Sequence, residues 1–500
     1  FEDRGGERPP FRRPFEDRGG ERPPFRERAP RPYPAPQRDF PAPPAAEGDP
    51  QSAPTQRPYD PRDEQGGSFG GRGPSARPPW GERRWQRAEQ PFRGRRDMGE
   101  GSGRDSRAEE GPRPAHRPQQ QRTPVQWAAR IVARSGPARA ADRELRSTMK
   151  LARGLTPEET RWISRAVFAY FRWQEWLDAE LPLERRIDQA AGFADTYARK
   201  PGFVKDEALA AHAVPAWVRE AMEVPVPWLR SLQREPRLWL RARPGKGPEV
   251  AAALGGDPDA VPGPVPDSVE YRGLKDLFKT PGFHKGEFEI QDVASQVVGH
   301  CCVPTAPEAD QRWWDVCAGE GGKTLHLGDL LAGKGTVLAT DRAEWRLDRL
   351  QQRISRARLL GVRWAAWDDA QPIPGEGGFD GVLVDAPCTG LGTWGRNPHA
   401  RWTVQPKDIE ELAARQLALL GRAAEAVKPG GQLVYSVCTL TRAETAGVAE
   451  AFLKVHADFE ALPFANPFVP GSEPAAFHVF WPQDTGGSGM FVAKWRRRLA

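Results

Sequence analysis

From residue 290 onward, short apolar segments rich in β-branched residues alternate with longer stretches of helical periodicity. Strands that alternate with helices are joined by crossovers and pair in parallel, so 291–500 predicts an α/β fold with a doubly wound sheet. A Gly-rich turn between 478–481 and 490–495 predicts a hairpin that adds an antiparallel edge. The predicted strands are 313–317, 336–341, 362–367, 379–385 and 432–438, and the clearest helices are 343–360 and 407–427.

Two smaller units are predicted ahead of this sheet. Residues 123–205 carry apolar side chains at helical spacing, and Thr156, Pro157 and Glu159 are typical of a helix start, so a helical domain is expected. Residues 206–290 mix helix-like and strand-like segments with Pro- and Gly-rich turns, which indicates a small α+β module. Within it we expect a helix at 217–222, a strand at 238–242 and a helix around Val250.

The first 122 residues differ in composition from the rest. They contain 25 Arg and no Lys against 20 Asp and Glu, and the string FEDRGGERPPFR occurs at both 1–12 and 15–26. Such a segment buries too little apolar surface to offset its ordering entropy, so 1–122 is expected to be a disordered tail. Its arginines and interleaved aromatic residues suit RNA phosphates and unpaired bases, although the same composition also suits a solvating tail without a ligand.

Two classes of protein are disfavoured by the sequence as a whole. No run of 18 apolar residues and no signal-like segment occurs, which favours a cytoplasmic protein without a membrane partner. The five cysteines are few and odd in number, as expected for reduced thiols, and no Cys or His spacing is typical of a metal site. Cys301 and Cys302 are interpreted as packing residues. Nothing in the sequence implies an oligomer.

The segment DVCAGEGGKT at 315–324 lies between a predicted strand and a predicted helix. Its glycines allow the backbone to approach a ligand closely and the helix start presents free N–H groups, so the segment predicts a nucleotide-like pocket. A phosphate-binding Walker A loop ending at Gly322, Lys323 and Thr324 would need Gly at position 317, which is Cys. That alternative is disfavoured, and Cys317 is interpreted as support for the cofactor loop.

Carboxylates follow the predicted strands at the edge that carries the glycine loop. Asp341 ends the second strand at a spacing from which an acidic side chain reaches ribose hydroxyls, Asp368 or Asp369 follows the third, and Asp385 ends the fourth. Each of them could instead cap a helix. Together they favour a cofactor with a ribose, an amine and a positive sulfonium over one that bears phosphates.

Cys388 and Cys438 follow the fourth and fifth predicted strands, so both thiols are expected over the same crevice. Carbon 5 of cytosine is a poor nucleophile toward a methyl sulfonium, but a thiolate that adds to carbon 6 raises the electron density at carbon 5. A second thiol could then assist the breakdown of the adduct. Asp385 could hydrogen-bond the cytosine as negative charge develops on the ring.

These segments resemble the RsmB-like (NOL/Nop/Sun) family of RNA cytosine-5 methyltransferases. The resemblance covers 285–497 well, whereas 215–285 is similar to the family's small RNA-binding module and 123–200 to part of its NusB-like helical domain. It implies a Rossmann-like methyltransferase domain at 291–500. The resemblance rests on EIQDVASQ at 289–296, DVCAGEGGKT at 315–324, FDGVLVDAPCTG at 379–390, RNPHARW at 396–402, KPGG at 428–431 and YSVCTL at 435–440.

The resemblance also implies roles for individual residues. Cys438 would be the nucleophile and Cys388 the thiol that assists product release, with Asp385 and Lys323 near the target base. Glu320 departs from the family, which often has Pro or Ala there. The cofactor, S-adenosylmethionine, would be contacted by Cys317, Ala318, Gly319, Glu320, Gly321, Gly322, Lys323, Asp341, Asp368 and Asp385.

The family implies an RNA substrate, with ribosomal RNA favoured over transfer RNA. A DNA cytosine-5 methyltransferase would instead take its nucleophile from the turn Pro387-Cys388, and the second thiol at Cys438 and the module ahead of the sheet disfavour it. A non-catalytic RNA-binding protein with a vestigial pocket is disfavoured because the glycines, the acids and both thiols are intact.

Overall fold

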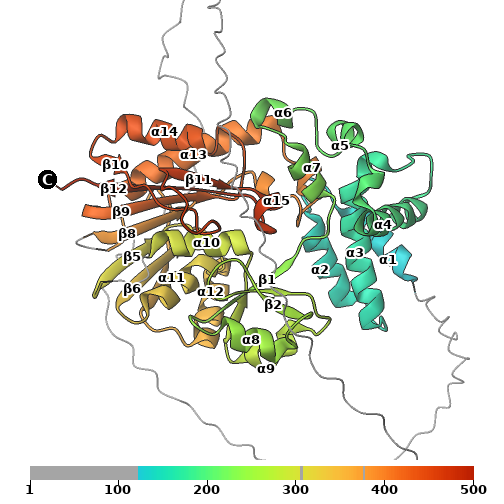
Figure 1. The fold of residues 1–500 in the computed structure, drawn as a ribbon, viewed down its shortest axis with the longest axis horizontal. Coiled ribbons are helices and arrows are strands. Elements are labelled where there is room, and N and C mark those ends of the chain that lie inside the picture. Colours follow the sequence, from blue (N-terminus) through green and yellow to red (C-terminus); the bar gives the residue numbers. More distant parts are fainter. Residues whose placement is uncertain (1–121, 304–307, 376–377, 500) are drawn as a thin grey trace, which may run out of the picture. The chain divides into compact units, whose positions relative to one another are not determined.

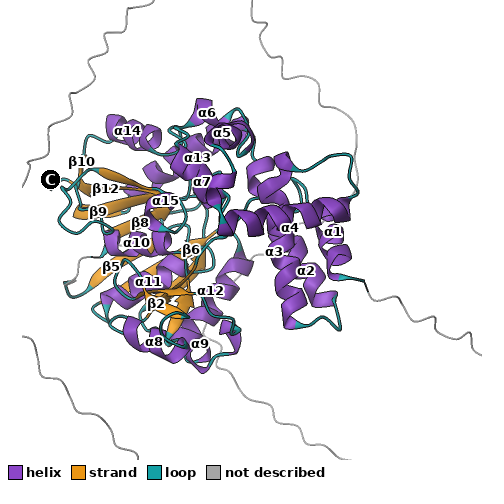
Figure 2. Ribbon diagram, turned by 45° about the vertical axis from the view of Figure 1, so that its right-hand side comes forward, coloured by secondary structure: helices purple, strands orange, loops and turns teal. Residues whose placement is uncertain are grey.

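The computed structural model describes residues 122–303, 308–375 and 378–499. They form a helical segment, a small sheet and a large sheet in chain order (Figure 1), and Figure 2 separates helices from strands. The predicted tail at 1–122 lies outside the described residues except for Arg122. Within the described ranges, no helix is both long and apolar enough to cross a membrane.

The first segment is helical because its apolar residues recur on one helix face and its helix starts are capped. The Thr156 hydroxyl accepts a hydrogen bond from the Glu159 backbone N–H, and the Glu159 carboxylate accepts one from the Thr156 N–H. The predicted helix start at Pro157 is therefore confirmed. The helices are α1 (Pro124–Arg134), α2 (Ala141–Leu151), α3 (Pro157–Trp173), α4 (Leu183–Arg199), α5 (Asp206–His212), α6 (Val218–Ala221) and α7 (Val226–Leu232).

Helical structure extends beyond the boundary that we expected at 205/206. Leu209, Val218 and Trp228, on α5 to α7, are buried in the same cluster as Trp173 of α3. The next strand begins at Leu238. We therefore propose that the helical domain ends after α7, because the apolar side chains of α5 to α7 belong to the same buried cluster as those of α1 to α4, and this cluster contains no residue of the small sheet.

The small sheet is antiparallel throughout, in the order β2-β3-β1-β4. Leu240 and Val269 from its strands pack with Val250 and Leu254 of helix α8 in one buried cluster. The strand expected at 238–242 and the helix expected around Val250 are confirmed. The elements are β1 (Leu238–Ala242), α8 (Gly247–Leu254), β2 (Ala260–Pro262), β3 (Ser268–Tyr271), α9 (Pro281–His284) and β4 (Phe288–Ile290).

The large sheet confirms the predicted doubly wound α/β arrangement. Its strand order is β10-β12-β9-β8-β5-β6-β7, and β7, β6, β5, β8 and β9 pair in parallel. Helices α10 to α12 and helices α13 and α14 contribute to two separate buried clusters, on opposite faces of the sheet (Figure 1). The elements are α10 (Val293–Cys302), β5 (Gln311–Asp315), α11 (Gly322–Leu331), β6 (Gly335–Asp341), α12 (Glu344–Ala357), β7 (Val362–Ala366), β8 (Phe379–Asp385), α13 (Pro406–Ala424), β9 (Val427–Val437), α14 (Ala446–Val455), β10 (Phe459–Ala461), β11 (Phe477–Phe480), α15 (Pro482–Thr485) and β12 (Met490–Arg497).

The predicted hairpin forms, but its second strand is not the edge of the sheet. Strand β11 pairs with β12 as expected, and β12 then pairs along its other side with β9. The short strand β10, which the sequence pattern did not predict, also pairs with β12. The eight-residue β12 is long enough to pair with β9 while its second side pairs with β11 near its start and with β10 near its end.

The direction in which successive strands are added to the sheet reverses between β5 and β8, which are parallel neighbours although β6 and β7 separate them in sequence. The connections that leave these two strands lead to helices on opposite faces of the sheet. A crevice therefore forms at the carboxyl ends of β5 and β8, the usual ligand site of such sheets.

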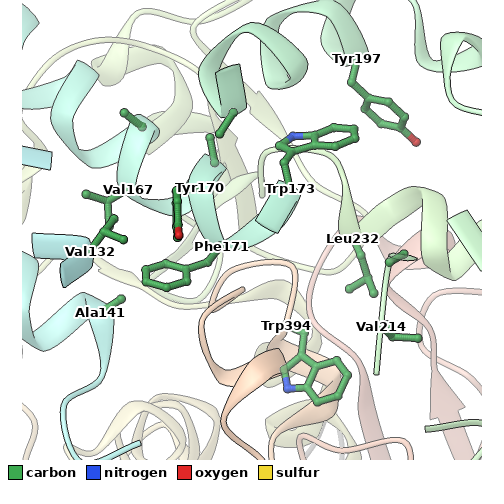
Figure 3. Packing of buried hydrophobic residues seen from close by; sticks show 14 of the residues in the cluster. Val132, Ala141, Val167, Tyr170, Phe171, Trp173, Tyr197, Val214, Leu232 and Trp394 are labelled. Atoms are coloured by element: carbon green, nitrogen blue, oxygen red, sulfur yellow. The ribbon is translucent and has the colours of Figure 1, made fainter. Parts of the chain in front are cut away.

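Trp394, from the loop that follows β8, is buried in the core of the helical domain (Figure 3). Its ring centroid lies 6.4 Å from that of Trp228 and 6.2 Å from that of Trp217. Nearby, the buried Arg401 guanidinium donates hydrogen bonds to Ala213 O and Leu232 O at 2.8 and 3.2 Å. The helical domain is thus packed directly against the loop that begins at the end of β8.

Candidate active site

The glycine loop between β5 and α11 has a backbone conformation that would be strained for a residue with a side chain. Gly319 and Gly321 have φ angles of 57° and 87°, in the left-handed region. A Cβ at Gly321 would lie 2.1 Å from Leu350 Cδ1, so this glycine allows helix α12 to pack close to the loop. The Gly319 N–H donates to Asp341 Oδ2 at 3.0 Å, which joins the loop to the end of β6.

A cavity of about 430 Å³ lies against this loop. Of the ten residues predicted to contact the cofactor, Gly321 alone does not line the cavity, because it faces Leu350 instead. Asp368 and Asp369 both line it, from the turn after β7. The lining residues are Ser295, Asp315, Val316, Cys317, Ala318, Gly319, Glu320, Gly322, Lys323, Asp341, Arg342, Arg346, Trp367, Asp368, Asp369, Asp385, Ala386, Pro387, Arg415 and Leu419.

Asp315 is a buried carboxylate that lines this cavity. It belongs to the motif at 315–324, but the sequence pattern predicted no role for it. Burial raises the pKa of Asp315 to about 7, although a hydrogen bond from Thr324 Oγ1 at 2.6 Å acts in the opposite direction. Its Oδ1 atom is buried and accepts no hydrogen bond from the described residues. The only signal in the sequence was its position at the carboxyl end of the first strand of the sheet.

Asp385 and Lys323, which both line this cavity, form an ion pair. Lys323 Nζ lies 2.7 Å from Asp385 Oδ2, and Ser436 Oγ donates to Asp385 Oδ1 at 2.8 Å. Burial alone would lower the pKa of Lys323, but the charge of Asp385 and the hydrogen bond to it raise this pKa, so the ammonium stays charged. Both predicted residues therefore lie in one charged group beside the thiols.

Cys388 and Cys438 come together, as the sequence predicted. Their Sγ atoms lie 3.3 Å apart, and both side chains are partly exposed. The hydrogen bond from Cys388 lowers the pKa of Cys438; burial opposes this effect, and the charge of Lys323 adds to it. The pKa of Cys388 is raised well above its ordinary value, first by the hydrogen bond to Cys438 and then by burial. Cys438 is thus the thiol that ionises more easily.

The remaining cysteines differ from this pair. Burial raises the pKa of Cys301 to about 12 and that of Cys302 well above its ordinary value, which fits their expected packing role. Burial likewise raises the pKa of Cys317, so this cysteine lines the cavity as a thiol.

A second cavity, of about 510 Å³, shares Lys323, Asp385 and Ser295 with the first. Cys438 lines it, as do Trp239 of the small sheet and Met490 of β12. A third cavity, of about 500 Å³, shares Arg237, Asp292 and Arg396 with the second and extends to α7 of the helical domain. Sequence reasoning missed Arg230, Arg234, Arg237 and Arg396, which line this outer part, because scattered arginines form a set only after folding.

Comparison with known proteins finds rRNA methyltransferases of the RsmB type both as a family model and as individual relatives. Residues 303–496 match the family model of the 16S rRNA methyltransferase RsmB/F. The probable ribosomal RNA small subunit methyltransferase B of Synechocystis sp. is 35% identical over 269 residues, which are 51% of this chain and 59% of that protein. The ribosomal RNA small subunit methyltransferase B of Escherichia coli is 30% identical over 296 residues, which are 56% of this chain and 65% of that protein.

The fold comparison extends beyond the methyltransferase domain. The crystal structure of PH0851 has a TM-score of 0.61 and 24% identity, and the match covers 75% of this chain and 98% of that one. This chain spans about three fifths of the length of the two curated relatives. The glycine loop, the doubly wound sheet and the match over 303–496 together support the assignment of this chain to the RsmB-like methyltransferase family.

Proposed function

We propose that this chain transfers a methyl group from S-adenosylmethionine to carbon 5 of a cytosine in RNA. The observation that carries the proposal is the 3.3 Å separation of Cys388 Sγ and Cys438 Sγ beside two adjoining cavities, one of which lies against the glycine loop. The names of the relatives support ribosomal RNA of the small subunit as the substrate, ahead of transfer RNA. Four arginines and two acidic residues, Glu235 and Asp292, line the outer cavity, and this excess of positive charge supports a polyanionic substrate.

The cavity at the glycine loop fits S-adenosylmethionine by size and charge. Its volume of about 430 Å³ is typical of small-molecule pockets. Asp315, Asp341, Asp368 and Asp385 provide acceptors for an amine and for ribose hydroxyls, and Asp315 Oδ1 has no partner among the described residues. When bound, S-adenosylmethionine supplies an electrophilic methyl group on a positively charged sulfur.

Cys438 begins the reaction as a thiolate. Its Sγ forms a bond to carbon 6 of the cytosine, and the electrons of the carbon 5–carbon 6 double bond move to carbon 5, which then takes up the methyl group. Asp385 holds the cytosine, and Lys323 balances the negative charge that develops beside it. Both side chains line the cavity that contains Cys438, as these roles require.

Cys388, whose side chain is partly exposed, ends the reaction by releasing its own proton to solvent and then accepting, as a thiolate, the proton of carbon 5. While Cys438 is a thiolate, its hydrogen bond and charge raise the pKa of Cys388. Formation of the sulfur–carbon bond removes that negative charge, so the pKa of Cys388 falls when a base is needed. As the proton leaves carbon 5, the double bond forms again and the bond between Cys438 Sγ and carbon 6 breaks.

The test measures transfer of tritiated methyl groups to purified small-subunit ribosomal RNA, transfer RNA and DNA. Cys438→Ala should abolish transfer, whereas Cys388→Ala should accumulate a covalent protein–RNA adduct that is visible on a denaturing gel. Cys301→Ala, at a buried cysteine outside the site, is the control and should behave like the wild type. An adduct that persists in Cys438→Ala and disappears in Cys388→Ala would instead support the DNA-type mechanism.

A further inference from the structure

Glu444 is a buried carboxylate in the turn between β9 and α14, outside the residues to which we have assigned catalytic roles. Its exposed fraction is 0%, and within the described part of the chain it forms no ion pair. Burial of a carboxylate without a cation is costly unless several hydrogen bonds compensate. A buried polar group whose hydrogen bonds are satisfied holds the segments around it in one arrangement.

Neutral groups surround this carboxylate. Oε1 accepts hydrogen bonds from the Thr389 N–H at 2.8 Å and from Gln416 Nε2 at 3.0 Å. Oε2 accepts one from Thr441 Oγ1 at 2.9 Å and another from the Thr389 hydroxyl. The Thr439 hydroxyl lies 3.1 Å from Oε2 and 2.9 Å from Thr389 Oγ1, so it can donate to either.

The positions of these donors in the sequence show which parts of the chain the network connects. Thr389 directly follows Cys388, and Thr439 directly follows Cys438. Gln416 donates a second hydrogen bond, at 2.9 Å, to the carbonyl oxygen of Pro387, the residue before Cys388. One carboxylate therefore joins the two turns that carry the two thiols, although 50 residues separate the cysteines along the chain.

We propose that Glu444 is a positioning residue that fixes the turn of Cys388 against the turn of Cys438, so that the two sulfur atoms stay within hydrogen-bonding distance. The effect of this positioning on methyl transfer rests on the proposed function, whereas the arrangement of the two turns around Glu444 does not. The charge of Glu444 acts on the same pair. After the hydrogen bond to Cys438 and burial, this charge further raises the pKa of Cys388. The proton is thereby retained on Cys388, and Cys438 is left as the nucleophile.

The first test measures the distance between the thiols without any methyl transfer. Diamide oxidises two adjacent thiols to a disulfide and is itself reduced to a hydrazine, and mass spectrometry of peptides follows the Cys388–Cys438 disulfide. We expect Glu444→Ala to form it about tenfold more slowly than the wild type, because small displacements of reacting groups cost rates of this order. Glu444→Gln, which keeps the acceptor Oε1, should recover part of the rate.

The matched control is Glu450→Gln, which alters a half-exposed glutamate on α14 and should leave disulfide formation unchanged. Circular dichroism checks that each variant is folded. If Glu444→Ala does not fold, Thr441→Val removes one donor that is adjacent to neither cysteine and should slow the disulfide by about two- to threefold. A folded Glu444→Ala, or in its place a folded Thr441→Val, that forms the disulfide at the wild-type rate would overturn the proposal.

The second test compares, as a function of pH, the rates at which iodoacetamide alkylates Cys388 and Cys438. Glu444→Gln should increase alkylation of Cys388 relative to Cys438, because loss of the negative charge lets Cys388 release its proton more easily. An unchanged pH profile in a folded Glu444→Gln would contradict the electrostatic role. If the thiol measurements follow expectation while the wild type transfers no methyl group to any RNA, the proposed function fails and the positioning role stands.

Discussion

Lys323 Nζ lies 2.7 Å from Asp385 Oδ2, and this ion pair forms part of the wall shared by the cavity at the glycine loop and the cavity at Cys438. Lys323 belongs to the first turn of α11, and Asp385 ends β8. The pair therefore joins the element that holds the glycine loop to the strand that leads to Cys388. The positive charge of Lys323 also lowers the pKa of Cys438, so the two parts of the site are electrostatically coupled.

Replacement of Lys323 by Met should make Cys438 less reactive. Removal of the positive charge, which leaves Asp385 unpaired, raises the pKa of Cys438, so alkylation by iodoacetamide at neutral pH should slow by about threefold to tenfold. Lys428→Met is the matched control, because Lys428 forms a similar ion pair, at 2.8 Å, with Asp380 near the opposite end of β8. Equal alkylation profiles for both variants would contradict the coupling.

Replacement of Asp315 by Asn should change how stability depends on pH. The pKa of Asp315 is raised to about 7 by burial, whereas an Asp in an unfolded chain titrates near about 4. Between these values the folded state binds more protons, so this residue's contribution to stability is present at low pH and is lost as the pH rises toward about 7.

The measurement is the free energy of unfolding in urea at several pH values between 4 and 8, taken as the difference between wild type and variant, since buried histidines also titrate in this range. We expect the wild type to lose stability relative to Asp315→Asn as the pH rises to about 7, and the difference to level off above it. Asp348→Asn, at an exposed position of α12, should show no such trend. A constant difference across the range for Asp315→Asn would mean that this carboxyl does not titrate there.

Gly321→Ala should destabilise the fold and weaken binding of S-adenosylmethionine. The left-handed backbone at this position costs a residue with a Cβ about 1–2 kcal/mol, and the added atom would lie 2.1 Å from Leu350 Cδ1. Gly192→Ala is the control, because its Cβ would meet nothing within 4 Å inside helix α4, and it should stabilise by about 0.5–1 kcal/mol. Urea denaturation and calorimetric titration measure the two effects, and a neutral Gly321→Ala would show that the loop relaxes.

Trp394→Ala should loosen the helical domain from the loop that follows Cys388. Removal of this fully buried indole leaves a cavity and should cost about 3–5 kcal/mol of unfolding free energy. Hydrogen exchange in α7 should accelerate, since Trp228 loses its stacked neighbour. Trp364→Ala, at a partly exposed position of β7, is the control. Unchanged exchange in α7 would indicate that other contacts, such as the hydrogen bonds of Arg401 and Trp402, hold the two parts together.

Local sequence signals determined most of the fold. The alternation of strands and helices, the capped start at Pro157 and the glycine loop each depend on residues close together in the chain, and the structure confirms them. The short strand β10 was missed, because three residues carry too little periodicity to be recognised. The local pattern also does not specify whether α5 to α7 belong to the helical domain, because their burial depends on what they pack against.

The sequence by itself determined which residue types were available at the carboxyl edge of the sheet: two cysteines, a lysine and several acids after predicted strands. Only the tertiary structure decided their distances. The pairing of Asp385 with Ser436 in the β8–β9 register brings the turns of Cys388 and Cys438 side by side, and the buried Glu444 joins them. Strand register and burial result from packing across the whole sheet, so contacts between residues far apart in the chain are absent from any local pattern.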